Sequence, residues 1–327
     1  MDRHFIYFET PQLATVVNDE APPPGPGEVL IAVDHAGINR ADLLQRLGLY
    51  PPPKDASPIP GLEVAGRVVA IGDECTTLKM EDRVCALTHG GGYASHAIAR
   101  EDHCLALPDS LLTEQGAALP EALLTFWYNV IERGQLSAGE TVLIQGGSSG
   151  IGSIGIQMAA ALGANVISTA GSAARCDAVE ALGASFVANH REGSLTGQFT
   201  DAGYGGHIDV ILDIAGGDVM QANLDLAAPD GRIVCIGVMR GMQSEINLAT
   251  LFTKRLTLTG STLRRLGTAE RARCFSAIRE RIWPQVIAGD IQPIVDTAYP
   301  LANVLEAHEH MRLGTHFGKL VLDCRMG

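Results

Sequence analysis

The sequence predicts an α/β protein in which a doubly wound parallel sheet accompanies a β-rich, barrel-like part. Short strands separated by glycine and proline turns fill the first hundred residues, and strands alternate with helices from about residue 120. A glycine turn also joins a buried strand to a helix near Gly146. The length of 327 residues suits about two domains.

Composition narrows the classes of function. There are 24 Lys and Arg against 37 Asp and Glu, a net charge of −13, which argues against nucleic-acid binding through phosphate neutralisation. No apolar run approaches the roughly 18 residues of a membrane span, and the first residues lack the order of a secretory signal. The seven cysteines are scattered, as free thiols in a reducing compartment would be. We expect a cytoplasmic protein without membrane or nucleic-acid partners.

The first part of the chain is expected to be a small barrel or sandwich. Its predicted strands follow proline- and glycine-rich turns, and proline cannot donate to a strand ladder. They cover residues 28–33, 64–71, 83–87 and 93–99.

The second part alternates in the manner of parallel βαβ units with both faces of the sheet covered. Its predicted strands cover residues 141–145, 165–170, 208–214, 232–237 and 256–260, and its helices cover residues 151–162 and 173–182. A charged helix is expected over residues 268–288, then a short strand, a helix over 301–313 and a last strand over 319–322. In that last helix, the His308-Glu309-His310 run is predicted to be solvent-exposed surface.

The glycine turn is the most informative motif. A strand ending at Gln145 runs into Gly146-Gly147-Ser148-Ser149-Gly150-Ile151-Gly152, and the helix that follows has a single apolar stripe. The free N–H groups and positive dipole of such a helix start suit a pyrophosphate. Of two glycine frames, Gly147/Ser149/Gly152 fits a dinucleotide site better than Gly150/Gly152/Gly155, because the phosphate turn must lie between strand and helix.

The second strand of this unit indicates which nucleotide binds. An NAD site usually has Asp or Glu about 20 residues after the glycines, on the ribose 2′-hydroxyl. Here the strand is followed by Gly171-Ser172, and no acid precedes Asp177. Ser172 can donate to a phosphate and Arg175 can grip one with two donors, which favours NADPH. The alternative is that Arg175 is only a solvated residue of the first helical turn.

Several further motifs together resemble the medium-chain dehydrogenase/reductase superfamily. Within it the sequence is most similar to the zinc-independent quinone oxidoreductases, particularly the tumour-suppressor-inducible NADPH type. Besides the glycine turn, the stretches that carry the resemblance are residues 37–42, 48–51, 61–66, 90–93, 119–125, 169–172 and 317–321.

The resemblance implies a Rossmann nucleotide-binding domain over residues 121–265, inserted into a GroES-like catalytic domain formed by residues 1–120 and 266–327. It also implies a homodimer joined through the nucleotide-domain sheets, with strands near residues 232–260 as candidates for the contact.

No metal is expected. Relatives that use catalytic zinc bind it with a Cys in the first segment, the His of a Gly-His-Glu segment and a later Cys or Asp. This chain has Asn39 near the expected Cys and Leu62 in place of the His. Neither an amide nor an aliphatic side chain replaces those ligands. Because alcohol oxidation needs a Lewis acid, the expected activity is NADPH-dependent hydride transfer to an acceptor that is itself electrophilic, such as a quinone.

The resemblance also implies roles for individual residues. Asn39, Asp42 and Tyr50 are the candidates for the acceptor pocket, with Tyr50 as a hydrogen-bond donor or weak acid. For Asn39 and Asp42 the alternative is capping of the next helix, and for Tyr50 it is loop packing. The cofactor-binding candidates are Thr125, Gly147, Ser148, Ser149, Gly150, Ile151, Gly152, Ser172, Arg175 and His190. His190 is placed by resemblance at the 2′-phosphate, with an exposed strand-end histidine as its alternative.

Three other functions compete with quinone reduction. The same cofactor and a metal-free site can reduce α,β-unsaturated carbonyls, and the wider family contains RNA-binding and lens-structural members. A dinucleotide sensor with negligible turnover is also compatible with the residues, because a proximity mechanism leaves no nucleophile or base signature.

Overall fold

The computed structural model describes residues 1–325 and separates into two compact units. The first unit holds Met1–Leu124, Leu266–Ala288 and the chain from Pro293 onward, and the second holds Thr125–Arg265 and Gly289–Gln292. Residues 326 and 327, the end of the predicted segment 266–327, lie outside the described residues. Within residues 1–325, every helix is too short or too polar to cross a membrane.

The first unit is built on a six-stranded sheet in the order β13-β14-β3-β4-β5-β6. Strand β3 also pairs with β6, so the four strands β3 to β6 close on themselves, and the β-rich barrel expected from the sequence is confirmed. The strands are β3 (Glu28–Gly37), β4 (Glu63–Ile71), β5 (Arg83–Thr88), β6 (His96–Ala106), β13 (Val295–Pro300) and β14 (Lys319–Asp323).

Two strand predictions in this unit were incomplete. The hairpin β1 (Asp2–Thr10) and β2 (Leu13–Glu20) was not predicted, because its second strand is mostly exposed and has no regular apolar alternation. The strand predicted over residues 93–99 is instead β6, which runs from His96 to Ala106 through the charged Arg100-Glu101-Asp102 segment. The charged segment does not show the apolar alternation of a strand, so the second half of β6 was not predicted.

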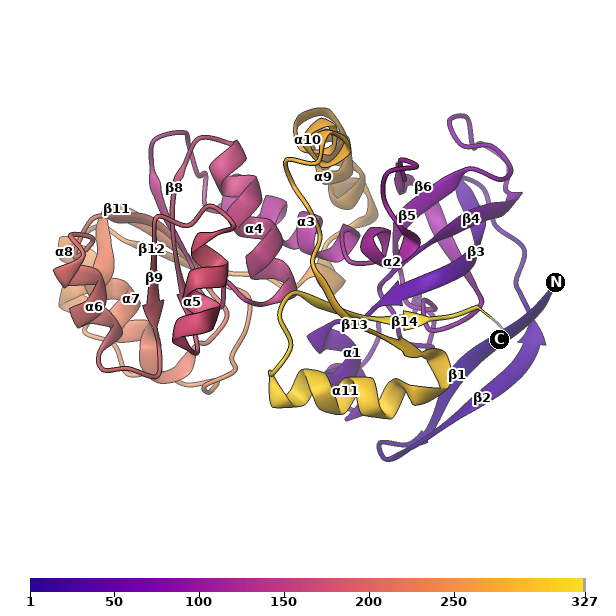
Figure 1. The fold of residues 1–327 in the computed structure, drawn as a ribbon, viewed down its shortest axis with the longest axis horizontal. Helices are drawn as coiled ribbons and strands as arrows, with labels where there is room; N and C mark the ends of the chain where they lie inside the picture. The colour runs from indigo at the N-terminus through magenta and orange to yellow at the C-terminus, as the bar shows by residue number, and fades with distance from the viewer. Residues whose placement is uncertain (326–327) are drawn as a thin grey trace. The chain divides into compact units, whose positions relative to one another are not determined.

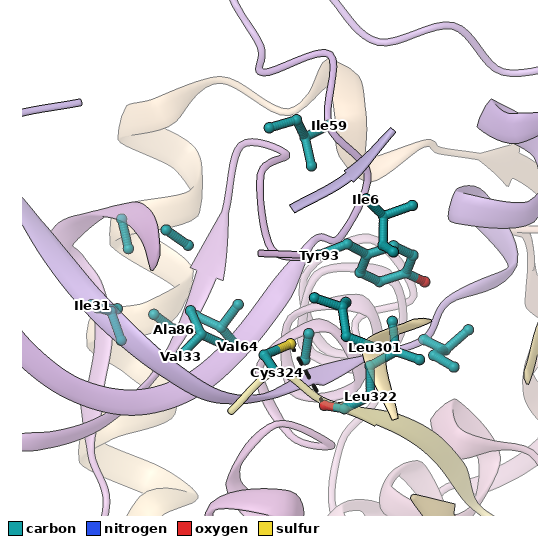
Figure 2. Close-up of a cluster of buried hydrophobic side chains, with 14 of the residues drawn as sticks. Ile6, Ile31, Val33, Ile59, Val64, Ala86, Tyr93, Leu301, Leu322 and Cys324 are labelled. Carbon is teal, nitrogen blue, oxygen red and sulfur yellow. Dashed lines mark hydrogen bonds between the residues drawn. The ribbon is translucent and has the colours of Figure 1, made fainter. Parts of the chain in front are cut away.

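The core of the first unit is one buried cluster that joins residues of the closed strands to residues of β1 and β14 (Figure 2). Alternate residues of β3 and β4, such as Ile31, Val33 and Val64, point into it and are at most 3% exposed. Ile6 and Leu322 lie in the same cluster, so segments from both ends of the chain contribute to one core.

Three helices of the first unit matter for the site. They are α1 (Arg40–Arg46), α3 (Pro120–Phe126, whose last two residues belong to the second unit) and α9 (Thr268–Arg281). The others are α2 (Thr113–Gly116), α10 (Trp283–Ala288) and α11 (Val304–Leu313), with 3₁₀ turns at Leu263–Arg265, in the second unit, and at Leu301–Asn303. The single helix predicted over residues 268–288 is broken at Ile282, because Pro284 lacks the N–H that would continue it.

Helix α11 overturns one prediction. His308 is 0% exposed, although the His308-Glu309-His310 run was expected to be solvated surface. Its ring stacks on Phe8 with centroids 6.0 Å apart, and its Nε2 lies 3.1 Å from the Tyr93 hydroxyl. The unpredicted hairpin β1–β2 supplies part of this cover, so the error follows from missing that hairpin.

The second unit is a six-stranded sheet in the order β12-β11-β10-β7-β8-β9, and every pair in it is parallel (Figure 1). This is the doubly wound order, in which the chain leaves β7 in one direction and later returns on its other side at β10. The strands are β7 (Thr141–Ile144), β8 (Asn165–Ala170), β9 (Phe186–Asn189), β10 (Ile208–Asp213), β11 (Ala227–Cys235) and β12 (Thr257–Gly260).

Helices connect these strands and cover the faces of the sheet (Figure 1). They are α4 (Gly150–Ala161), α5 (Ala173–Glu180), α6 (Leu195–Asp201), α7 (Met220–Leu226) and α8 (Leu248–Thr253), with a π-helix at Trp127–Arg133 and a 3₁₀ turn at Gly217–Val219. The predicted fold class, which combines a Rossmann-type parallel sheet with a separate β-rich domain, is therefore confirmed.

Candidate functional site

The glycine turn follows β7 at the point where the strand order of the second unit reverses. Ser149 is the N-cap of α4, and its Oγ accepts a hydrogen bond from the Gly152 N–H at 3.0 Å. Thr169 of β8 supports the other side of the turn, because its Oγ1 accepts from the Gly146 N–H at 3.0 Å and its carbonyl accepts from the Gly147 N–H at 2.9 Å. The turn is thus held by the N-cap of α4 on one side and by β8 on the other.

Two glycines in this turn are required by close contacts. A Cβ at Gly147 would lie 2.3 Å from Ser168 Oγ, and a Cβ at Gly152 would lie 2.2 Å from the Gly146 carbonyl oxygen. Gly146 itself has a φ of 71°, which favours glycine. Gly147 and Gly152 belong to the Gly147/Ser149/Gly152 frame that the sequence analysis preferred.

The turn fits a pyrophosphate. Among the described residues, nothing accepts from the backbone N–H groups of Gly150 and Ile151, which open the first turn of α4. Free N–H groups and the dipole of a twelve-residue helix stabilise an anion at the helix N-terminus. Ser148, which is half-buried, lies beside these groups.

A cluster of basic side chains lies at the ends of β8 and β9. Ser172 is the N-cap of α5, and Gly171 precedes it at the end of β8. A Cβ at Gly171 would lie 3.2 Å from His190 Nε2 and 3.5 Å from Arg191 Nε, so both side chains reach over this glycine. Arg175, in the first turn of α5, completes the cluster.

The charged side chains that shift the pKa of His190 show which residues lie close to it. Burial lowers the pKa of His190, and the nearby charges of Arg191, Arg240 and Arg175 lower it further. Arg240 is also paired with Asp218, with Nε and Oδ1 2.6 Å apart. An anion bound among these groups would favour protonated His190. The structure therefore brings together Ser172, Arg175 and His190, and adds Arg191, which the sequence analysis missed.

Thr125 lies on α3 and is 5% exposed. Its carbonyl accepts a hydrogen bond from Asn129 Nδ2 at 2.9 Å, which anchors the junction between α3 and the π-helix. This contact involves the backbone carbonyl, so the cofactor-binding role predicted for Thr125 stays a prediction.

In the first unit, Asn39 is held by a buried ion pair. It is the N-cap of α1, but its side chain turns away from the helix: Nδ2 donates to Glu63 Oε1 at 2.8 Å, and Oδ1 accepts from Lys319 Nζ at 2.6 Å. Lys319 also donates to Glu63 Oε1, and Glu63 is fully buried. Because Nδ2 carries two hydrogens, one donor of Asn39 remains beyond this network.

Asp42 is also fully buried and has a structural role. Its carboxylate accepts from the Asn39 N–H at 2.9 Å, the capping contact considered from the sequence, and from the Gly61 N–H at 3.0 Å. Its charge and its hydrogen bond contribute, after burial, to raising the pKa of Tyr93 well above its ordinary value. Asp42 therefore fixes the backbone at Asn39 and Gly61.

Tyr50 is half-buried and lies near Arg271 of α9. Burial lowers the pKa of Arg271, and Tyr50 acts against this shift. Arg271 is 6% exposed and its Nη1 lies 3.3 Å from His89 Nδ1. His89 Nε2 lies 3.3 Å from Asp55 Oδ2, so this ring donates through Nε2 and accepts from Arg271 through Nδ1. Arg271 and His89 were not predicted, because their partners are far away in the sequence.

The predicted residues thus fall into two sets, one in each unit. Asn39 and Asp42 share a buried cluster in the first unit. Tyr50 lies near Arg271 in the same unit. The cofactor candidates of the second unit lie along the glycine turn and the end of β8. Within residues 1–325, no three His, Cys, Asp or Glu side chains are arranged to hold a metal ion.

Comparisons with known proteins agree with this fold. Residues 25–109 match the alcohol dehydrogenase GroES-like domain, and residues 150–279 match the zinc-binding dehydrogenase family. The quinone oxidoreductase of Sus scrofa is 32% identical over 320 residues, which are 96% of this chain and 95% of that protein. The structure of Escherichia coli quinone oxidoreductase complexed with NADPH has a TM-score of 0.84 at 27% identity and covers 99% of this chain and 100% of that one.

The chain also resembles part of much longer proteins. A mycocerosic acid synthase-like polyketide synthase of Mycobacterium tuberculosis is 33% identical over 307 residues, and the match covers 92% of this chain but 14% of that protein. Taken together, the two domain matches and the near full-length similarity to quinone oxidoreductases show that this chain belongs to the medium-chain dehydrogenase/reductase superfamily.

Proposed function

We propose that this protein is an NADPH-dependent, metal-free quinone reductase. The observation that carries the proposal is the Lys319 ammonium 2.6 Å from Asn39 Oδ1. A buried positive charge at this position disfavours a divalent cation beside Asn39, and an amide paired to it is a poor zinc ligand. A site of this kind suits an acceptor that needs no Lewis acid.

The choice of NADPH rests on the basic cluster at Gly171. Arg175, His190 and Arg191 offer charge-assisted donors for a 2′-phosphate. The sequence has no Asp or Glu between the glycine turn and Asp177, where NAD enzymes place the acid that holds the ribose hydroxyl. The E. coli relative with NADPH supports the same choice. When bound, this cofactor would supply the hydride.

The residues of this chain would then bind and orient the two reactants. The N–H groups of Gly150 and Ile151 would hold the pyrophosphate, with Gly147, Ser148, Ser149 and Gly152 forming the turn. On the acceptor side, the spare N–H of Asn39 and the Tyr50 hydroxyl would donate to the acceptor oxygen. Orientation and proximity of this kind account for large rate effects without a nucleophile.

We expect the purified protein to reduce ortho- or para-quinones with NADPH faster than enones, and faster with NADPH than with NADH. The reason is that a quinone delocalises the charge that hydride addition creates. Steady-state rates over a panel of quinones and enones with both nucleotides measure this, with elemental analysis of the same sample for bound metal.

Each other outcome of the panel has a meaning. Faster enone turnover would assign the protein to enone reduction, and nucleotide binding without turnover would indicate a sensor. Retention of single-stranded RNA at moderate salt would favour the RNA-binding alternative. One transition metal per chain would contradict the metal-free mechanism.

The assignment of residues 1–120 and 266–327 to catalysis, and of residues 121–265 to the nucleotide, is part of the same proposal. A cytoplasmic location stays a prediction from the sequence. We further propose a homodimer formed through β12, the edge strand of the parallel sheet, whose outer side pairs with no other described strand. Leu258 on β12 and Phe252 on α8 are 40% and 66% exposed.

We expect Leu258→Arg to convert this dimer to a monomer, because it places a charge in the strand that would face the partner. Size-exclusion chromatography with light scattering measures the mass. Leu13→Arg is the matched control, since Leu13 is 47% exposed on a strand of the first unit. A monomeric parent, or loss of the dimer in the control instead, would contradict the proposal.

A further inference from the structure

A cavity of about 490 Å³ lies within the first unit, and none of the candidate acceptor or cofactor residues lines it. Cavities of roughly 300–1,000 Å³ have the size that small-molecule ligands occupy. The lining comes from β3, β4, β5, the loop after β6, α2 and the segment after β14. Its charged and ionisable side chains include Asp34, His35, Arg67, Arg83, Glu114 and Arg325.

A β-bulge in β3 brings two neighbouring side chains to this cavity. Val33 and Ala36 both belong to the buried core, and the register of β3 against β4 shifts between Val33 and His35, so Asp34 is an extra residue. Neighbouring side chains of a regular strand point to opposite faces, whereas here Asp34 and His35 both line the cavity. Bulges that redirect side chains in this way are frequent beside functional sites.

His35 is fixed in the wall of the cavity and leaves one ring nitrogen for a ligand. The side chain is 4% exposed, and its Nδ1 lies 2.9 Å from the Thr113 hydroxyl oxygen. Within residues 1–325, no group forms a hydrogen bond with its Nε2. Burial lowers the pKa of His35, so the ring is neutral at pH 7 and Nε2 donates or accepts according to the tautomer.

The side chains around His35 are mostly acidic. Three carboxylates act against the lowering of its pKa, those of Asp323, Glu114 and Asp34. Asp323 is paired with Arg325, with Oδ2 and Nη2 2.6 Å apart. Asp34 and Glu114 are half-buried, and no group of the described chain donates a hydrogen bond to either carboxylate. Because three carboxylates face one guanidinium, this end of the cavity favours a cation.

The wall formed by β4 and β5 is basic. Arg67 and Arg83 lie directly opposite each other in the two strands, and like charges in that position destabilise a sheet. Arg83 is held by two backbone carbonyls and by Asp109. Arg67 is exposed, and its one hydrogen bond among the described residues runs from Nη1 to the Glu81 carbonyl at 3.2 Å. Since a guanidinium has five donors, Arg67 keeps most of its donors for an anion.

We propose that this cavity binds a small zwitterion, with the carboxylate of the ligand at Arg67 and its ammonium group at Asp34 and Glu114. On β4, the residue opposite His35 is Ala65, two positions before Arg67, which is about 7 Å along a strand. This spacing suits a dipeptide or an ω-amino acid better than an α-amino acid. A divalent metal ion does not fit the acidic end, because no three ligands of the described chain are arranged to hold one. Binding here is independent of the proposed quinone reduction.

The first test compares 6-aminohexanoate with hexanoate and hexylamine, each of which carries one of its two charges. Isothermal titration calorimetry of the full chain at pH 7 measures the three affinities. We expect 6-aminohexanoate to bind at least about tenfold more tightly than either other probe, because both of its charges are compensated. Equal binding of hexanoate or hexylamine would overturn the proposal, and so would no binding of 6-aminohexanoate at about 10 mM.

The second test locates the probe in the cavity. Arg67→Gln should weaken binding of 6-aminohexanoate by about tenfold and leave hexylamine unchanged. The double variant Asp34→Asn, Glu114→Gln should weaken 6-aminohexanoate by a similar factor and leave hexanoate unchanged. Arg281→Gln and Asp73→Asn, which alter exposed residues elsewhere in the first unit, are the matched controls and should bind as the parent does. Unchanged binding in both cavity variants would contradict the assignment.

The cavity variants are expected to fold. Arg67 is exposed, and removing it also removes the like-charged pair with Arg83, so Arg67→Gln should unfold at the temperature of the parent or above it. Thermal unfolding followed by circular dichroism measures this. A clearly lower unfolding temperature would mean that Arg67 serves the sheet and not a ligand. The comparison of the three probes on the parent needs no variant, and it decides the proposal even if a variant fails to fold.

Discussion

The variant with both Arg175 and Arg191 replaced by alanine is expected to bind NADPH no better than NADH. In the proposed site each arginine would make charge-assisted hydrogen bonds to a 2′-phosphate, and hydrogen bonds to charged groups contribute about 1.5–3 kcal/mol each. Losing both should weaken NADPH binding by about 100-fold or more and leave NADH nearly unchanged. Isothermal titration calorimetry with the two nucleotides measures both affinities.

The control for this experiment is Arg312→Ala, because Arg312 is an exposed arginine of α11 paired with Glu309. It should keep the preference of the parent for NADPH. Equal affinities of the parent for the two nucleotides would refute the assignment of the basic cluster, and so would an unchanged preference in the double variant. The single variant Arg175→Ala then shows how much of the preference belongs to the residue that the sequence identified.

Replacing Lys319 by methionine is expected to lower the free energy of unfolding by about 3–5 kcal/mol. Lys319 and Glu63 are 4% and 0% exposed, so the substitution leaves a carboxylate buried without its counter-charge. It also frees the Asn39 amide that Lys319 fixes. Urea denaturation followed by circular dichroism measures the loss in the transition of the first unit.

A second variant distinguishes the charge from the packing. Glu63→Gln combined with Lys319→Met removes both charges, and it should be more stable than Lys319→Met alone, because no buried charge is left over. If Lys319→Met unfolds within about 1 kcal/mol of the parent, the ion pair does not stabilise the core as described.

Local patterns predicted the nucleotide unit well. The run from Thr141 to Gly152 contains a buried strand, a glycine turn and a capped helix within twelve neighbouring residues, and every contact that shapes the turn is local or comes from the next strand. The strand order then follows from the rules for parallel βαβ units. For the same reason Ser172 could be recognised as a helix start near the expected ribose position.

The cluster around Asn39 could not be predicted in this way. Glu63 and Lys319 are 256 positions apart, and Glu121 meets Glu63 across 58 positions. Such contacts depend on which strands become neighbours in the closed barrel, and no periodicity in one segment reports that. His308 was misjudged for the same reason, since the hairpin that covers it lies at the other end of the chain.

The pairing of β14 with β3 has a consequence for how the polypeptide acquires its structure during synthesis. Val321 pairs with Gly37, and Cys324 donates its N–H to Asp34, so the ribosome must translate nearly 300 further codons before the early strands gain this neighbour. The nucleotide unit, whose strands all lie between residues 141 and 260, is complete sooner. During synthesis the nucleotide unit would therefore fold first. The other unit, whose residues precede and follow it in the sequence, would be completed only when β14 leaves the ribosome and pairs with β3.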